Sequence, residues 1–122
     1  MPIETYRSLT VWQKAVTFTV LVYQLLEKFP RNEQYGLVSQ MQRAAVSIPS
    51  NIAEGRERQS DRDFSRFIVI ALGSLAELET QLLISQRLGY LTESDLQTIT
   101  PQADEIGKML RGLHKKLIAG SR

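Results

Sequence analysis

The sequence predicts an all-α protein, an up-down-up-down antiparallel four-helix bundle, and three observations carry this prediction. Strand signals are nearly absent, because no alternating stretch is bounded by Asn-Gly or Asp-Gly turns. Helix start and stop signals recur four times along the chain. Apolar residues between them follow helical spacing, most regularly over 96–117. The four helices are expected to form one domain over residues 1–122.

The first predicted helix spans about residues 9–29 and differs from the others in its apolar pattern. Thr10 and Gln13 have the spacing of a capping box, and Pro30 disfavours helical geometry in the residue before it. Two apolar stripes follow the helix, whereas a bundle helix needs only one to reach its core. The second stripe therefore predicts a subunit interface, and singly exposed apolar residues are the alternative. The residues selected for this interface are Trp12, Val16, Phe18 and Tyr23.

The second predicted helix spans about residues 33–55. Asn32 is expected to be its N-cap, and Gly55 is expected to take the left-handed conformation that often follows a helix. Pro49 lies inside the helix and removes one backbone donor, so we expect a kink there and not a break. The side chains expected to bond the freed backbone groups are those of Ser47, Ser50 and Asn51.

The third predicted helix spans about residues 61–88, and the fourth spans about 93–118. Ser60 is the expected N-cap of the third helix, and Gly89 is expected to end it in a left-handed conformation. Tyr90 is expected to fold back onto the last turn as the hydrophobic partner of a Schellman cap. All the predicted connections are short, so consecutive helices should be antiparallel neighbours.

Composition excludes several classes of function. The chain has no cysteine, which removes disulfides, Cys-ligated metals and thiol catalysis. The lone histidine, His114, has Arg111 three residues before it, so the Glu-x-x-His motif of bundle di-metal sites is absent. The longest uncharged apolar-rich stretch, 15–26, is too short to span a bilayer. We expect a soluble cytoplasmic protein that uses no metal or other cofactor.

The densest polar segment runs from residue 47 to residue 58. Its functional interpretation is a prepared site around a proline kink, and its structural interpretation is a helix end whose exposed carbonyls are bonded by nearby side chains. The candidate residues in it are Ser47, Pro49, Asn51, Glu54 and Gly55. An enzyme would need a pocket that encloses Glu54 with a second ionisable group, and the sequence supplies neither a nucleophile nor a phosphate-binding loop. We expect no catalytic activity.

The basic residues indicate a binding function more clearly than the polar segment indicates a catalytic one. Lys and Arg dominate the chain after Glu105, where no acidic residue follows. Such side chains on a helix can follow the phosphates of a nucleic acid, although they also complement the dipole at a helix C-terminus. The cations after Glu105 are Lys108, Arg111, Lys115, Lys116 and Arg122. The candidate contacts to RNA or DNA are Arg111, Lys115 and Lys116, followed by Lys108 and Arg43.

Several stretches together resemble a known family. They are 9–15, Phe29-Pro30, 36–55 and 71–78, and the most specific is Ser47-Ile48-Pro49-Ser50-Asn51-Ile52-Ala53-Glu54-Gly55. Over nearly its whole length the chain resembles bacterial four-helix-bundle proteins of the 23S rRNA intervening-sequence type. A structurally similar branch is the accessory variability protein of diversity-generating retroelements, which binds nucleic acid and a reverse transcriptase.

The resemblance implies a ring-shaped homopentamer. Together with the basic C-terminus, it leads to the hypothesis of a non-catalytic pentamer that binds RNA or DNA as an accessory of ribosomal RNA or of a retroelement-like system. Five copies of a chain with a net charge of +2 would carry enough positive charge to attract a polyanion. The alternative is an interaction scaffold whose ring recruits a protein partner, with nucleic-acid binding incidental.

Overall fold

A computed structural model describes residues 5–120, and helices make up most of this range. The four long helices are α1 (Thr10–Leu26), α2 (Leu37–Arg56), α3 (Asp61–Arg87) and α4 (Glu93–Gly120). Two short 3₁₀ turns, Tyr6–Ser8 and Arg31–Glu33, precede α1 and α2. The described residues contain no β-strand. The predicted all-α fold with four helices is confirmed.

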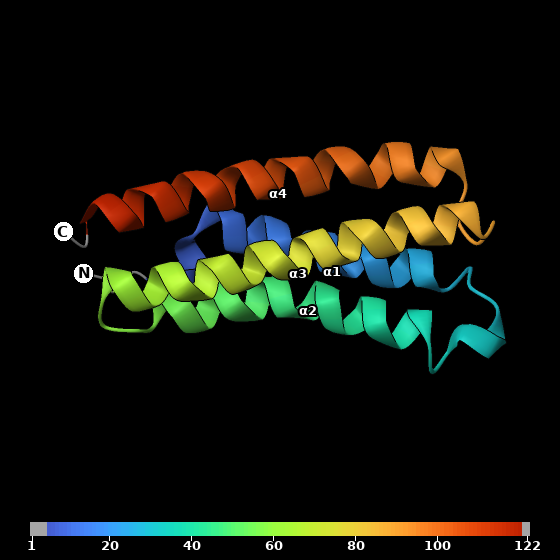
Figure 1. Ribbon diagram of the computed structural model, residues 1–122, viewed down its shortest axis with the longest axis horizontal. Coiled ribbons are helices and arrows are strands. Elements are labelled where there is room, and N and C mark those ends of the chain that lie inside the picture. The colour runs from blue at the N-terminus through green and yellow to red at the C-terminus, as the bar shows by residue number, and fades with distance from the viewer. Residues whose placement is uncertain (1–4, 121–122) are drawn as a thin grey trace.

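The helices lie side by side in an elongated bundle (Figure 1). The α1–α2 and α3–α4 connections lie at one end, and the α2–α3 connection lies at the other end together with the last turn of α4 (Figure 1). We call the latter the α2–α3 end. Each helix packs on two others: α1 and α3 both contact α2 and α4. Within residues 5–120, α1 does not contact α3 and α2 does not contact α4, so these are the diagonal pairs of the bundle.

Only one of the two apolar stripes of α1 enters the core. The buried stripe consists of Val11, Ala15, Phe18, Val22, Leu25 and Leu26. Phe18 has no exposed surface within its own chain, so its assignment to a subunit interface is wrong. Three side chains on or beside the other stripe remain exposed. Their exposed fractions are 36% for Val16, 52% for Val20 and 40% for Tyr23.

The connection from α1 to α2 differs from the prediction. The backbone N–H groups of residues 27–29 donate three residues back, so α1 tightens into a 3₁₀ turn after Leu26. The predicted capping box of Thr10 is absent, because Gln13 donates to the Arg7 carbonyl at 2.8 Å. Asn32 lies inside a 3₁₀ turn and does not cap α2. Glu33 does so from outside, where its Oε1 accepts from the backbone N–H of Leu37 at 3.2 Å.

The two glycines predicted to end helices behave differently. Gly89 has a φ of 82° and forms the expected Schellman motif, in which the N–H of Tyr90 donates to the Ser85 carbonyl at 2.9 Å. The ring of Tyr90 does not fold back onto α3: it packs on Phe29 and its hydroxyl donates to Glu33 at 3.0 Å. Gly55 is helical and buried, and α2 continues through it to Arg56.

Pro49 lies in the middle of an unbroken α2. It cannot donate to the carbonyl of Ala45, four residues earlier. That oxygen lies 3.1 Å from the hydroxyl of Thr19 on α1, which also lies 2.8 Å from the Ala15 carbonyl. The donor therefore comes from a neighbouring helix, and not from the serine and asparagine side chains of α2 as predicted from the sequence.

Candidate nucleic-acid interface

The last three turns of α4 present a row of free cations. Lys108, Arg111 and Lys115 follow an i, i+3, i+7 spacing, which puts them on one face of the helix. Lys116 lies beside them, and all four side chains are exposed. Within residues 5–120, none of the four makes an ion pair shorter than 4 Å. Arg122, the last cation of the predicted run, lies outside the described residues.

The acidic residues of α4 lie in its first half, and two of them are paired with α1. The Lys28 ammonium lies 2.6 Å from Asp95, and the Lys14 ammonium lies 3.1 Å from Glu105. Charge on α4 is therefore separated along the helix, with anions toward the N-terminus and cations toward the C-terminus. This order complements the helix dipole at both ends.

Among the α4 cations, Arg111 acts on an acidic group of the neighbouring helix. Glu79, on the neighbouring α3, has a pKa above its ordinary value because of burial and then because of the charge of Asp104. The Arg111 guanidinium opposes this shift and lowers the pKa of Glu79. Arg111 therefore already favours an anion of its own chain.

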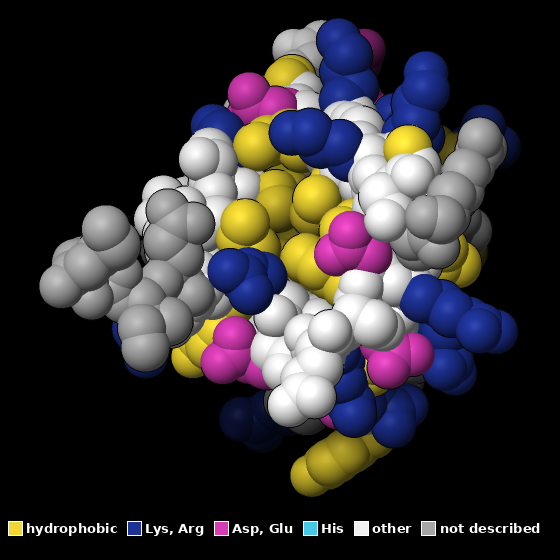
Figure 2. Space-filling model, turned by 90° about the vertical axis from the view of Figure 1, so that its left-hand side faces the viewer, with side chains coloured by type: hydrophobic (Ala, Val, Ile, Leu, Met, Phe, Trp, Pro, Cys, Tyr) yellow, Lys and Arg dark blue, Asp and Glu magenta, His cyan; other side chains and the backbone are white. Residues whose placement is uncertain are grey.

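The α2–α3 end brings further basic residues to the C-terminal turns of α4. Figure 2 shows this end, where Lys and Arg side chains surround an apolar centre and acidic side chains are fewer. Gly120 approaches Asp61 so closely that an added Cβ would lie 2.7 Å from its carboxylate. A hollow of about 370 Å³ lies beside this contact, lined by residues of 56–64 and by Leu117. The basic residues from the helices that meet here are Arg56, Arg58, Arg62, Arg66, Lys115 and Lys116.

A second group of basic residues, within 56–66, is visible in the sequence but far from the basic tail along the chain. Antiparallel helices with short connections put the α2–α3 connection and the end of α4 at the same end of a bundle. The acidic side chains of Glu54, Glu57, Asp61 and Asp63 lie in the same segment and reduce its net charge. The positive potential of this end therefore depends on the lysines of α4.

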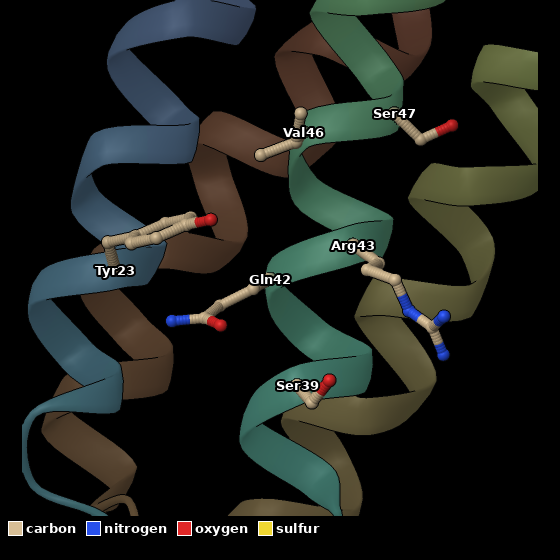
Figure 3. A pocket seen from close by; sticks show the side chains of 6 residues that line it. All are labelled: Tyr23, Ser39, Gln42, Arg43, Val46 and Ser47. Carbon is tan, nitrogen blue, oxygen red and sulfur yellow. The ribbon is translucent and has the colours of Figure 1, made fainter. Parts of the chain in front are cut away.

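Arg43 does not join this surface. It lies on α2, the helix diagonal to α4, and its side chain points toward α3 together with that of Ser47 (Figure 3). It lines two shallow pockets, one between α1 and α2 and the other between α2 and α3. Arg43 therefore lies away from the α4 cations, and its contact with a nucleic acid stays a prediction.

The polar segment of α2 has structural contacts. The Ser47 hydroxyl lies 2.8 Å from the Ser74 hydroxyl on α3, and the Asn51 amide donates to the carbonyl and hydroxyl of Ser47 at 2.7 and 2.9 Å. Pro49 is buried. Gly55 allows α2 to approach α3, because an added Cβ would lie 2.6 Å from the Cβ of Phe67. These contacts join α2 to α3 and fix their relative position.

Glu54 does not lie in an enclosed pocket with a second ionisable group. Its carboxylate lies 3.0 Å from the Arg58 guanidinium one turn later, and its side chain is 57% exposed. Arg58 in turn lies over the ring of Phe67. Among the described residues, no group of three or more His, Asp or Glu side chains is placed to hold a metal ion.

Comparisons with known proteins agree on one family. The sequence model described as 23S rRNA-intervening sequence protein matches residues 7–112. Among solved structures, the chain is similar to a protein of unknown function from the S23 ribosomal protein family of Bacteroides thetaiotaomicron. The identity is 32% and the TM-score 0.77, over 87% of this chain and 99% of that chain. No curated protein matches the chain.

Proposed function

We propose that this chain, which belongs to the 23S rRNA-intervening sequence protein family, is a non-catalytic nucleic-acid-binding accessory protein of the cytoplasm. In this proposal the four helices form an up-down-up-down bundle, and several bundles assemble as a ring, with five copies implied by the resemblance described above. The ligand is RNA or DNA, bound through its phosphates. No catalytic step and no cofactor form part of the proposal.

The observation that carries the proposal is the set of unpaired cations at the α2–α3 end. Lys115 and Lys116 are exposed and make no ion pair within the described residues. Free lysines of this kind can replace the counterions that surround a phosphate backbone. They belong to the end of the bundle where other Lys and Arg side chains surround an apolar centre (Figure 2). This supports binding to the backbone and indicates no preference among base sequences.

The test is fluorescence anisotropy with a labelled structured rRNA fragment, titrated at several salt concentrations with duplex DNA as competitor. The variant Lys115→Gln with Lys116→Gln removes two phosphate contacts. The slope of log Kd against log salt concentration should then fall by about two, since each neutralised phosphate contributes close to one. Arg111→Gln should change the slope less than a change of Lys115 or Lys116, because the Arg111 guanidinium already interacts with the Glu79 carboxylate of its own chain.

The matched control is Arg31→Gln, compared with Lys115→Gln alone, because it removes one exposed charge from the opposite end of the bundle. The Arg31 variant should keep the wild-type slope. Equal losses in the two single variants would show that net charge alone attracts the RNA. An unchanged slope in the Lys115 and Lys116 variant would overturn the assignment of the surface.

A second candidate function is a scaffold for a protein partner. Its supporting observation is the exposed apolar surface of α1 and α3, where Val20 and Val69 are each about half exposed. Affinity purification from the native cell, with and without nuclease, separates the two functions. A stoichiometric partner that survives nuclease treatment supports the scaffold, whereas loss of all partners with nuclease supports nucleic-acid binding.

A further inference from the structure

Among the residues that the structure describes, none covers two apolar faces of the bundle. The first, the α1–α2 face, consists of Val16, Val20, Tyr23 and Val46. It includes a groove of about 490 Å³ between the two helices, into which Tyr23 and Val46 project (Figure 3). The second, the α3 face, consists of Val69, Ile70, Gly73, Ala76, Leu83 and Ile84. Since α1 and α3 are diagonal in the bundle, the α1 residues and the α3 face point in different directions.

Contacts between the helices fix the heights of these residues along the bundle. The Thr19 hydroxyl meets the Ala45 carbonyl, so these two residues are level. The Ser47 and Ser74 hydroxyls are likewise level. Because α2 and α3 run in opposite directions, Ala45 is level with Ala76, and Thr19 therefore lies at the height of Ala76 (Figure 1).

At these heights the two faces have complementary shapes. Counting along α1 and α3 from this common level places Val16 at the height of Gly73 and Tyr23 at the height of Thr80. The large side chains of α1 thus coincide in height with a strip of small residues on α3. A Cβ added at Gly73 would meet no atom within 4 Å, so the strip is open to an approaching helix. Val69 and Leu83, about half exposed, lie above and below it.

Two pairs of charged residues border the faces at similar heights. By the same count Glu27 lies about one helical turn from the height of Arg87, and Glu57, which follows α2, lies within one turn of the height of Arg62. Both pairs combine opposite signs, and none of these four side chains makes an ion pair shorter than 4 Å among the described residues. Arg43 and Glu77 instead line one groove between α2 and α3 of the same chain.

We propose that the α1–α2 face of one copy packs on the α3 face of a second copy of this chain. The inference rests on the proposed assembly and specifies its interface. Two different faces make the contact head-to-tail, which gives a ring where the rotation between copies closes and a filament where it does not. The matching heights of the two faces, which need no axial shift, favour the ring. The α3 helix is also apolar and long enough to cross a membrane, but Glu77 and Glu79 lie on its exposed side, which suits a protein partner better.

The test is a complementation of two broken faces, followed by light-scattering mass over a concentration series. Variant one is Val16→Lys with Val20→Lys, and variant two is Gly73→Lys with Ala76→Lys. Each should be monomeric alone, because lysines on either face prevent close contact. An equimolar mixture should form species of two chains, one of each variant, since only one intact pair of faces remains. Tyr35→Lys, at a side chain that is 96% exposed and outside both faces, is the control and should keep the wild-type mass.

A charge swap gives a second measurement for the case that the lysine variants fold poorly, as judged by circular dichroism. Glu27→Arg should weaken assembly about two- to five-fold, as expected for a surface pair, and adding Arg87→Glu should restore it. A lysine variant that is folded and keeps the wild-type mass overturns the interface but leaves the proposed assembly standing. A wild-type chain that is monomeric at every concentration overturns both, and vesicle binding by that monomer would identify a membrane as the occupant of α3.

Discussion

Thr19 is the residue on which the central proline of α2 depends. Its hydroxyl is placed to donate to the Ala45 carbonyl, the oxygen that Pro49 leaves without its usual helical partner. Thr19→Val keeps the shape and removes the donor, so the free energy of unfolding should fall by about 1–3 kcal/mol, the cost of an unsatisfied buried acceptor. Urea denaturation monitored by circular dichroism measures this loss.

The matched control for Thr19 is Thr98→Val on α4. The Thr98 hydroxyl also donates to the carbonyl four residues earlier, at 3.1 Å, but it reaches no neighbouring helix and is exposed. Its loss should change stability by less than about 0.5 kcal/mol. Equal effects at the two sites would show that the contact between α1 and α2 contributes nothing of its own.

Gly55 marks the closest approach of α2 to α3. In Gly55→Ala the new Cβ would lie 2.6 Å from the Cβ of Phe67 and 2.9 Å from the Cδ1 of Phe64, so the helices must move apart. We expect a loss of about 1–3 kcal/mol, even though alanine favours a helix by about 1 kcal/mol over glycine. Gly112→Ala, where nothing lies within 4 Å of the new Cβ, should be stabilising by up to about 1 kcal/mol. Thermal or urea unfolding of both variants makes the comparison, and a stabilised Gly55→Ala would contradict it.

Single residues also show where sequence reasoning succeeds and where it fails. The conformation of Gly89 follows from local chemistry, because a left-handed residue after a helix is nearly always glycine or asparagine. Gly55 has the same signal in the sequence but a different cause, the nearness of another helix. That cause depends on which residue of α3 lies opposite, which the sequence pattern of α2 does not contain.

At the scale of elements, the start of α4 is held by a reciprocal cap joined to α1. The backbone N–H of Asp95 donates to the Thr92 hydroxyl at 3.0 Å, and the backbone N–H of Thr92 donates to the Asp95 carboxylate at 2.9 Å. The other carboxylate oxygen of Asp95 accepts from the Lys28 ammonium at 2.6 Å. These interactions, with Lys28 contributing most, lower the pKa of Asp95 below its ordinary value.

This shift predicts how stability changes with pH. Because the pKa of Asp95 is lower in the folded chain, the unfolded chain binds a proton first as the pH falls, and the stabilisation is present above the unfolded value of about 3.9 and is lost below it. Asp95→Asn should therefore reduce the fall in urea midpoint between about pH 5 and pH 3. Glu93→Gln, an exposed acid in the same turn, is the control and should leave the slope unchanged. A wild-type slope in Asp95→Asn would contradict the prediction.

Helices with strong local signals were predicted well, and the connection lacking such signals was not. The first turn of α3 follows from Ser60, whose hydroxyl accepts from the Asp63 N–H at 3.1 Å as expected. The start of α2 is capped by the Glu33 carboxylate, which also accepts a hydrogen bond from the hydroxyl of Tyr90, far away along the sequence. A cap that is positioned by a residue of the α3–α4 connection cannot be recognised from local sequence.

At the scale of the whole molecule, periodicity predicted the bundle and the unpartnered side of α1, but it missed the second exposed face. The outer residues of α3 are apolar and lie next to core residues in the helical pattern, so periodicity alone does not separate them from the core. They are exposed because α3 packs between α2 and α4, with Gly73 and Ala76 turned away from both. The candidate site was likewise predicted in part, since the lysines of α4 were identified but their neighbours across the bundle were not.

The separation of charge along α4 has a consequence for any assembly in which the copies share one axial direction. Each copy contributes a dipole of the same sense, so the dipoles would add around the ring instead of cancelling as they do across a two-fold axis. One rim would collect the lysines at the α2–α3 end, and at the other rim the anions at the start of α4 would be offset by Lys28, Arg31 and Arg87. The two sides of the disc would then differ in charge, and a polyanion would bind to the lysine side. Two lysine rims would also repel each other, which opposes stacking of the discs through that side.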